Sequence, residues 1–209
     1  MSGKSHDLEG AYALRTPEDS VRYYGEWAKS YDSDFAADME YRSPDRVAEA
    51  FAALGGSGPV LDVGAGTGLV AEALARRGIA PADGIDISEE MLAVAAAKGV
   101  YRATIRADLT GVLPVENSVY SGVISAGTFT HGHVGPAAFH ELLRVAAAGA
   151  VFAVTVHSAV YEAGGFAAEF AGLGDRIEGF RTDPFRIYGR AAGADHADDT
   201  GWIVSFRKR

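Results

Sequence analysis

Residues 60–69 read Val60-Leu61-Asp62-Val63-Gly64-Ala65-Gly66-Thr67-Gly68-Leu69. An apolar, strand-like run ends in three glycines at alternate positions, and a helical pattern over 69–77 follows directly. Glycine lets the backbone turn sharply, and it lets a ligand lie against bare main chain because it has no side chain. The stretch therefore predicts a strand, a tight turn and a helix, with a ligand bound at the turn.

An aspartate ends the next strand-like run, in Gly84-Ile85-Asp86-Ile87-Ser88. Asp86 lies 20 residues beyond Gly66, about the interval at which nucleotide-binding folds place a carboxylate that holds a ribose diol. Asp86 could instead be a helix cap, but Ser88 is available for that purpose. The spacing favours a cofactor that contains a nucleoside.

The alternation of strand-like and helix-like runs predicts the fold class. Expected strands are 60–63, 83–87, 101–107, 119–125 and 150–157, with closing strands at 185–189 and 202–207; expected helices are 69–77, 89–97, 136–145 and 165–173. This order predicts an α/β fold with a Rossmann-like, doubly wound, mostly parallel seven-stranded sheet. Right-handed crossovers bring the loops after the strands to one edge, where ligands bind.

Two helix-start signals precede this core. Thr16-Pro17 predicts a helix that continues to about Tyr31, and Ser43-Pro44-Asp45 predicts a second helix that ends at Gly55-Gly56. We therefore expect N-terminal helices over 1–56 that act as a lid or substrate cap, and a core domain over 57–209.

Composition narrows the classes of function. The chain has 209 residues and a net charge of −9, which fits one domain and disfavours bulk binding to nucleic acid. It has no cysteine, so disulfides, thiol nucleophiles and thiolate metal sites are excluded. The N-terminus lacks the apolar core of a signal peptide, and the longest apolar run, 145–154, is too short for a membrane span. We expect a cytoplasmic monomer or homodimer with no membrane or nucleic-acid partner, and a solvated basic end at Arg207-Lys208-Arg209.

From Val60 onward the chain resembles the class I S-adenosylmethionine-dependent methyltransferases. The likeness rests on 61–68, on 84–88 with Met91-Leu92, on Ala107-Asp108-Leu109 with Leu113-Pro114, and on His133-Val134 with 141–145. Upstream, Trp27-Ala28-Lys29-Ser30-Tyr31-Asp32 resembles the lead-in helix of the small-molecule branch. Within that branch, the His133-Val134 segment is most similar to the methyltransferase-like proteins of the Williams-Beuren region.

The resemblance implies S-adenosyl-L-methionine as cofactor, S-adenosyl-L-homocysteine as product and a small-molecule methyl acceptor. It implies methyl transfer by in-line displacement, with the glycines near the methionine portion, Asp86 on the ribose and Asp108 on the adenine amino group. Asp62 and Asp108 could instead be a structural charge and a solvated loop residue. The implied cofactor-binding residues are Trp27, Tyr31, Asp62, Gly64, Ala65, Gly66, Asp86, Ile87, Met91, Asp108, Leu109, Ser125 and Ala126.

Aromatic residues and histidines are the candidates for contact with the acceptor. Tyr23, Trp27 and Tyr31 recur every four residues, with Tyr24 offset to the same side, so they form either a lid over the acceptor or a core-facing stripe. Tyr23, Tyr24 and His131 are the expected substrate-binding residues. His131 and His133 are candidate general bases, or else ordinary loop histidines, and no metal site is expected because no nearby carboxylate completes a ligand set.

Two other functions fit the same pattern. An NAD(P)-dependent Rossmann oxidoreductase shares the glycine turn and the acidic residue, but its fingerprint places Gly or Ala where this chain has Leu69. A non-catalytic module that binds S-adenosylmethionine would keep every cofactor residue. The sequence does not select the acceptor, the methylated atom or the pathway.

Overall fold

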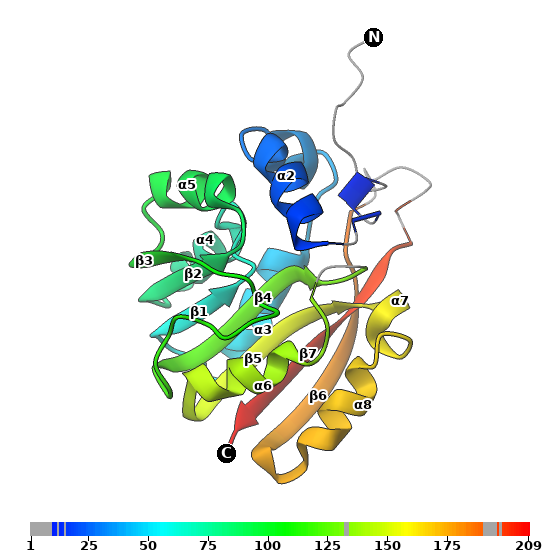
Figure 1. Ribbon diagram of the computed structural model, residues 1–209. Coiled ribbons are helices and arrows are strands. Elements are labelled where there is room, and N and C mark those ends of the chain that lie inside the picture. The colour runs from blue at the N-terminus through cyan, green and yellow to red at the C-terminus, as the bar shows by residue number, and fades with distance from the viewer. Residues whose placement is uncertain (1–9, 12, 15, 132–133, 190–195, 197) are drawn as a thin grey trace.

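The computed structural model describes residues 10–209 except 12, 15, 132–133, 190–195 and 197. Within this part of the chain, seven strands form one sheet in the order β3-β2-β1-β4-β5-β7-β6 (Figure 1). The predicted α/β fold with a mostly parallel seven-stranded sheet is confirmed. The strands are β1 (Val60–Val63), β2 (Ala82–Asp86), β3 (Ala103–Arg106), β4 (Tyr120–Phe129), β5 (Ala146–His157), β6 (Ile177–Arg186) and β7 (Thr200–Lys208).

Strands β1 to β5 run parallel, whereas β7 lies antiparallel between β5 and β6. In the register of the sheet, Asp62 of β1 pairs with Gly84 of β2 and with Ile124 of β4. The loops that follow these three strands therefore leave the sheet at the same edge. This edge carries the glycine turn and Asp86, as the sequence predicts.

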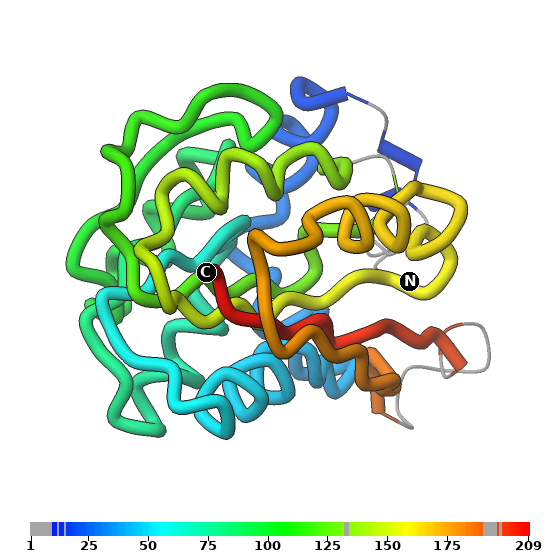
Figure 2. Tube along the Cα trace, turned by 90° about the horizontal axis from the view of Figure 1, so that it is seen from below, coloured from blue at the N-terminus to red at the C-terminus, as the bar shows by residue number. Residues whose placement is uncertain are grey.

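Helices cover both faces of the sheet, and Figure 2 shows α3 and α4 on one side and α6 and α8 on the other. Side chains of α3 and α4 share a core with Val60, Ile124 and Val151, whereas those of α6 and α8 share one with Leu61, Phe152 and others. The helices are α2 (Pro17–Trp27), the π-helix η1 (Tyr31–Ala37), α3 (Ser43–Ala53), α4 (Leu69–Ala75), α5 (Glu89–Ala97), α6 (Ala138–Val145), α7 (Ser158–Tyr161), α8 (Phe166–Leu173) and the 3-10 helix η2 (Gly174–Arg176).

The N-terminal helix starts where the sequence predicts and ends earlier. Thr16 caps α2 by accepting a hydrogen bond from the Asp19 N–H at 3.1 Å. The predicted continuation to Tyr31 is wrong, because α2 ends at Trp27 and the π-helix η1 begins at Tyr31. The break changes the direction of the chain so that Asp32 in η1 reaches Thr67 and Lys98 of the core. A tertiary contact thus overrides the helical pattern.

Strand β6 also departs from expectation. The closing strand expected at 185–189 is in fact Ile177–Arg186, and β5 begins at Ala146 rather than Ala150. Strand β6 lies at the edge of the sheet and is largely exposed, so it lacks the apolar alternation that marks a strand in sequence. Pro184 fits this position, because an edge strand tolerates a missing N–H donor.

The basic C-terminus is part of the fold rather than a solvated end. The Arg207 guanidinium donates to the carbonyl oxygens of Leu54 and Gly149, and Lys208 Nζ donates to the Ala146 carbonyl at 2.7 Å. These bonds tie β7 to the end of α3 and to the start of β5. Among the described residues, no helix has both the length and the apolar composition that crossing a bilayer requires.

Phe51 anchors α3 to the sheet. Its side chain is fully buried, and its ring lies against Gly56 and Gly122, so closely that a Cβ at either glycine would overlap the ring. Glycine at 122 therefore allows α3 to approach the middle of β4. Although the sequence groups α3 with the lid, its apolar side packs on the core of the sheet.

We expect Gly122→Ala to destabilise the protein by roughly 1–3 kcal/mol, because the added methyl group overpacks the Phe51 ring. Adding Phe51→Leu should recover part of this loss. Gly172→Ala is the matched control, since its Cβ would meet open space on α8 and should be neutral or stabilising. Urea denaturation measures the wild type, the three single variants and the double variant. Additive effects of Gly122→Ala and Phe51→Leu would contradict the proposed contact.

Candidate functional site

The glycine turn after β1 has the backbone geometry that its sequence predicts. Gly64 and Gly66 have φ angles of +66° and +52°, which side-chain-bearing residues rarely adopt. A Cβ at Gly64 would overlap the Thr128 hydroxyl, whereas at Gly66 it would meet open space. The N–H groups of Gly64 and Ala65 donate to the Ile85 carbonyl at 2.9 and 3.0 Å, which fixes the turn to β2. Bare main chain at Gly66 therefore faces the cavity beside it.

Asp86 joins this turn to the loop after β2. Its Oδ2 accepts from the Gly66 N–H at 2.8 Å, and its Oδ1 accepts from the Ser88 N–H at 2.8 Å. Burial raises the pKa of Asp86, and these backbone N–H groups oppose that shift. Ser88 caps α5 by accepting from the Met91 N–H at 3.3 Å, so the carboxylate of Asp86 is not used as the helix cap. Each of its oxygens keeps a second acceptor position.

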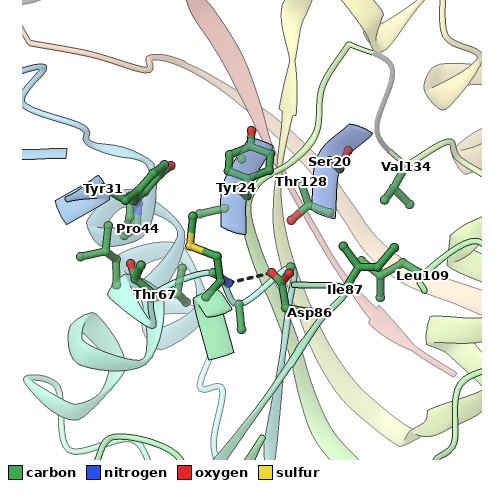
Figure 3. Close-up of a pocket in the computed structure, with 18 of the residues that line it drawn as sticks. Ser20, Tyr24, Tyr31, Pro44, Thr67, Asp86, Ile87, Leu109, Thr128 and Val134 are labelled. Atoms are coloured by element: carbon green, nitrogen blue, oxygen red, sulfur yellow. Dashed lines mark hydrogen bonds between the residues drawn. The ribbon is translucent and has the colours of Figure 1, made fainter. Parts of the chain in front are cut away.

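A cavity of about 990 Å³ of empty space, partly open to solvent, lies over this turn. In Figure 3, Tyr24 and Tyr31 of the N-terminal segment lie across the cavity from Thr67 and Asp86. The residues that line it are Pro17, Ser20, Tyr24, Tyr31, Tyr41, Pro44, Gly64, Ala65, Gly66, Thr67, Leu69, Val70, Asp86, Ile87, Met91, Asp108, Leu109, Thr110, Ala126, Gly127, Thr128 and Val134.

A second cavity, of about 550 Å³ of empty space, adjoins the first. The two share Tyr24, Tyr31, Tyr41 and Gly127 as lining residues. The remaining lining residues of the second cavity come from the N-terminal segment and from the ends of β4, β5, β6 and β7. They are Ala11, Trp27, Phe35, Ser43, Phe129, Thr130, Thr155, Val156, His157, Phe185, Ile187, Tyr188 and Gly201.

Asp62 lies beneath the turn and outside the lining of both cavities. It is fully buried, its Oδ2 accepts from the Tyr101 hydroxyl at 2.5 Å, and its Oδ1 has no hydrogen-bond partner within the described residues. Burial raises the pKa of Asp62 to about 7, the Tyr101 hydrogen bond lowers it, and the nearby charge of Asp86 raises it further. A Cβ at Gly84 would overlap the Tyr101 ring, so glycine there lets Tyr101 reach Asp62.

Aromatic rings of the N-terminal segment contact one another above the sheet edge. Tyr31 lies with its ring centroid 5.1 Å from that of Trp27 and 4.9 Å from that of Phe35. Trp27 and Phe35 are buried, and Tyr23 and Tyr24 pack against the same cluster. The stripe thus forms a small core, and its members Tyr24 and Tyr31 also line both cavities, while its role as a lid over the acceptor stays a prediction.

The π-helix η1 is tied to the glycine turn by a polar chain. The Thr67 hydroxyl donates to Asp32 Oδ1 at 2.5 Å, and Lys98 Nζ lies 2.6 Å from Asp32 Oδ2 and 3.1 Å from Glu72 Oε2. These groups are partly buried, so solvent screens them less than it screens exposed pairs. The contact holds the aromatic segment over the first cavity. π-Helices are rare in proteins overall, and those that do occur often lie at functional sites.

The structure brings most of the predicted cofactor residues to the first cavity and leaves three outside its lining. Of those three, Trp27 lines the second cavity, Asp62 lies beneath the turn, and Ser125 is buried with its hydroxyl donating to the Val63 carbonyl at 2.6 Å. Those in the first cavity are Tyr31, Gly64, Ala65, Gly66, Asp86, Ile87, Met91, Asp108, Leu109 and Ala126. Tyr23, which was predicted to bind the substrate, lines neither cavity and packs in the aromatic cluster.

His131, the described one of the two histidine candidates, does not line the first cavity. The His131 ring lies 4.8 Å from the His157 ring, centroid to centroid, and His131 lines neither cavity. His133 falls outside the described residues. Among the described residues, no group of three or more potential ligands could hold a metal ion.

Sequence reasoning missed several lining residues. Ser20, Pro44 and Tyr41 belong to the N-terminal segment, whose position over the core depends on tertiary contacts. Thr67 and Thr128 could have been found, because each lies one or two residues from a predicted site residue. His157 ends β5 at the same edge as the other loops, which is the signal that pointed to Asp86.

The sequence and the structure of this chain are similar to those of known methyltransferases. Residues 60–149 match the family profile described as a methyltransferase domain. In shape the chain matches a SAM-dependent methyltransferase from Aquifex aeolicus with a TM-score of 0.59, at 18% identity, covering 88% of this chain and 98% of that chain. The chain has the methyltransferase fold.

Two further matches agree with the methyltransferase fold. The structure described as a DhpI-SAH complex matches with a TM-score of 0.65 at 18% identity, covering 92% of this chain and 96% of that chain. In sequence, the chain is 31% identical over 140 residues to methyltransferase-like protein 27 of Homo sapiens. That match covers 65% of this chain and 57% of the human protein, so the chain spans little more than half the length of this relative.

We expect the free energy of unfolding to depend on pH through Asp62. Between about pH 4 and pH 7 the folded protein keeps a proton on Asp62 that the unfolded chain has released, because burial raises the folded pKa to about 7. The contribution of Asp62 to the free energy of unfolding is fully present below the pKa that Asp62 has in the unfolded chain. It falls as pH rises above that value, by up to about 1.4 kcal/mol per pH unit. Asp62→Asn should lack this part of the decline.

Urea denaturation across this pH range measures the effect as the difference between wild type and variant. Tyr101→Phe is the companion variant: it removes the hydrogen bond that favours the carboxylate, so the decline should extend to higher pH. Parallel stability curves for wild type and Asp62→Asn would refute the assignment.

We expect Asp32→Asn to loosen η1. The amide oxygen can still accept from Thr67, but the charge that faces Lys98 is lost, so the local opening free energy should fall by roughly 0.5–1 kcal/mol. Hydrogen exchange of the 31–37 amides measures this change. Asp34→Asn is the matched control, because its carboxylate accepts from Ser33 on the same helix. Equal protection in both variants would show that the Asp32 contact does not hold the segment.

Proposed function

We propose that the protein transfers a methyl group from S-adenosyl-L-methionine to a small-molecule acceptor by in-line displacement. The observation that carries the proposal is the meeting of the glycine turn, Asp86 and the loop after β3 in one cavity, within a segment that matches a methyltransferase domain. The DhpI-SAH structure, which shares the fold, is a complex with the demethylated form of this cofactor.

The residues of the first cavity fit each part of the cofactor. Asp86 has acceptor positions left after its bonds to Gly66 and Ser88, so both ribose hydroxyls could donate to it. Ile87 and Leu109 offer an apolar pocket for a purine ring (Figure 3). The open main chain at Gly66 leaves room for the methionine portion. Asp108 lines the same cavity, although its Oδ1 accepts from Thr110.

When bound, S-adenosylmethionine supplies a methyl group on a sulfonium, so that an acceptor lone pair forms the new bond while the C–S electron pair stays on sulfur. The chain itself has to orient the two reactants and exclude water. Tyr24, Tyr31 and Pro44 cover the cavity on the side of the N-terminal segment. Orientation alone contributes up to roughly 7–11 kcal/mol to such reactions. A base is needed only where the acceptor is protonated at the working pH, and the acceptor proton then passes to that base or to water.

Asp62 has a positioning role in this proposal. It lies directly beneath the turn without lining the cavity, and it holds Tyr101 against Gly84 and Gly68. The role predicted from the sequence, a negative charge near the cofactor ammonium, would then act through the turn rather than by contact. His131 and His133 keep their predicted role as candidate bases, and the monomeric or dimeric state likewise stays a prediction.

The decisive experiment compares cofactors by isothermal titration calorimetry. We expect S-adenosylmethionine and S-adenosylhomocysteine to bind and NAD to give no heat. Asp86→Asn should weaken S-adenosylmethionine binding by roughly 10–100-fold, because charge-assisted hydrogen bonds to the ribose are lost. Asp45→Asn is the control, since its partners Arg76 and Arg77 lie on the surface away from the cavity.

Turnover is measured as S-adenosylhomocysteine release with a panel of small acceptors. NAD binding without S-adenosylmethionine binding would overturn the proposal in favour of an oxidoreductase. Tight S-adenosylmethionine binding without turnover on any acceptor would favour a non-catalytic binding module.

A further inference from the structure

We propose that the second cavity is the acceptor site and that it takes an uncharged aromatic alcohol. The inference rests on the proposed function, since it assigns the acceptor to the space beside the cofactor cavity. We call this space the aromatic chamber, defined by the lining residues of the second cavity given above. Its empty space of about 550 Å³, part of which is open to solvent, lies beside the first cavity.

The aromatic chamber and the first cavity meet at a boundary that carries hydroxyl groups. Tyr24, Tyr31 and Tyr41 line both cavities, and a Cβ at Gly127 would overlap the Tyr41 hydroxyl. Gly127 has a φ of +80°, and its N–H donates to the Thr155 hydroxyl at 2.9 Å. A nucleophilic hydroxyl at this boundary would therefore face the first cavity, with polar side chains beside it.

The walls of the chamber are flat aromatic rings that pack against one another. The Phe35 ring centroid lies 5.2 Å from that of Trp27, 5.4 Å from that of Tyr41 and 5.9 Å from that of Tyr188. Tyr41 and Tyr188 lie 5.8 Å apart. Aromatic pairs favour further aromatic neighbours in stacked or edge-to-face arrangements, so an arene in this space would continue the existing packing.

Charge in the chamber is low. Among its described lining residues there is no Asp, Glu, Lys or Arg, and the polar side-chain groups are hydroxyls, the Trp27 indole N–H and the His157 ring. Burial lowers the pKa of His157, the nearby His131 lowers it further, and Asp199 acts in the opposite direction. His157 Nδ1 accepts from the Ala159 N–H at 3.2 Å, which fits a neutral ring. A carboxylate or phosphate on the acceptor would lose its hydration without gaining a cationic partner among these residues.

A cationic acceptor is disfavoured for two reasons. An ammonium group has no lone pair to attack a methyl group, and its charge would add to that of a sulfonium in the neighbouring cavity. Aromatic rings do attract cations, but the chamber supplies no carboxylate from its described lining residues. The neutral phenol is therefore the acceptor chemistry that the chamber favours.

Three probes with the same ring and hydroxyl group test the proposal: p-cresol is neutral, 4-hydroxyphenylacetate is anionic, and tyramine is cationic. Each is titrated into protein saturated with S-adenosylhomocysteine, and binding is followed by calorimetry and ligand-detected NMR. We expect p-cresol to bind at least about tenfold more tightly than either charged probe, because burying an ionic group without an opposite charge costs far more than burying a neutral one. Equal or tighter binding of a charged probe, or no binding of any probe, would overturn the acceptor assignment.

Failure of the proposed function has a different signature. If S-adenosylhomocysteine itself does not bind to the folded protein, the cofactor proposal fails and the acceptor proposal fails with it. Normal S-adenosylhomocysteine binding without p-cresol binding refutes the acceptor assignment alone.

Two variants separate the cavities. Tyr188 lines only the aromatic chamber and Asp86 only the first cavity. Tyr188→Leu should weaken p-cresol binding by about tenfold while S-adenosylhomocysteine binding changes less than about twofold, because a stacking ring is lost from one cavity only. Asp86→Asn should reverse that order. If thermal melting shows that Tyr188→Leu does not fold, Phe35→Leu replaces it. Unchanged p-cresol affinity in the folded variant would place the arene elsewhere.

Discussion

One hydrogen-bonded carboxylate organises the ligand-binding edge of this protein. Asp86, at the end of β2, accepts the Gly66 N–H from the turn after β1 and the Ser88 N–H from its own loop. These bonds fix the distance between the first two loops of the sheet edge. The glycines at 64 and 66 are needed because the turn reaches the carboxylate only with positive φ angles. The parallel strands bring the loops after β1 and β2 near each other, and the hydrogen bonds of Asp86 fix their relative positions.

The N-terminal segment completes the site by a different kind of contact. Aromatic packing among Trp27, Tyr31 and Phe35 gives the segment a small core of its own, and the Asp32 contacts with Thr67 and Lys98 orient that core over the turn. Burial of apolar surface stabilises the segment but is not directional, whereas the hydrogen bond and ion pair of Asp32 fix how the segment is oriented. The combination explains why aromatic residues of one short segment line two adjoining cavities.

The sequence predicted the core of the fold well because its signals are local. The ends of strands can be recognised from hydrophobic periodicity and from the residue types that favour turns, without any tertiary information. Gly64, Gly66 and Asp86 lie at such strand ends. Strand β6 was misplaced because an exposed edge strand has no apolar alternation to detect. The early end of α2 at Trp27 and the position of Tyr41 depend on contacts between segments far apart in the chain, which no local pattern encodes.

The reversed direction of β7 has a consequence for the diversity of such proteins. Because β7 runs against its neighbours, β6 ends and β7 begins at the edge where the loops of the parallel strands gather, with Arg186 paired to Thr200. Phe185, Ile187, Tyr188 and Gly201 around this junction line the aromatic chamber but not the cavity over the glycine turn. A hairpin connection can change length or composition without altering the handedness of any crossover. Substitutions in this connection can therefore alter the lining of the aromatic chamber without touching the residues of the glycine turn.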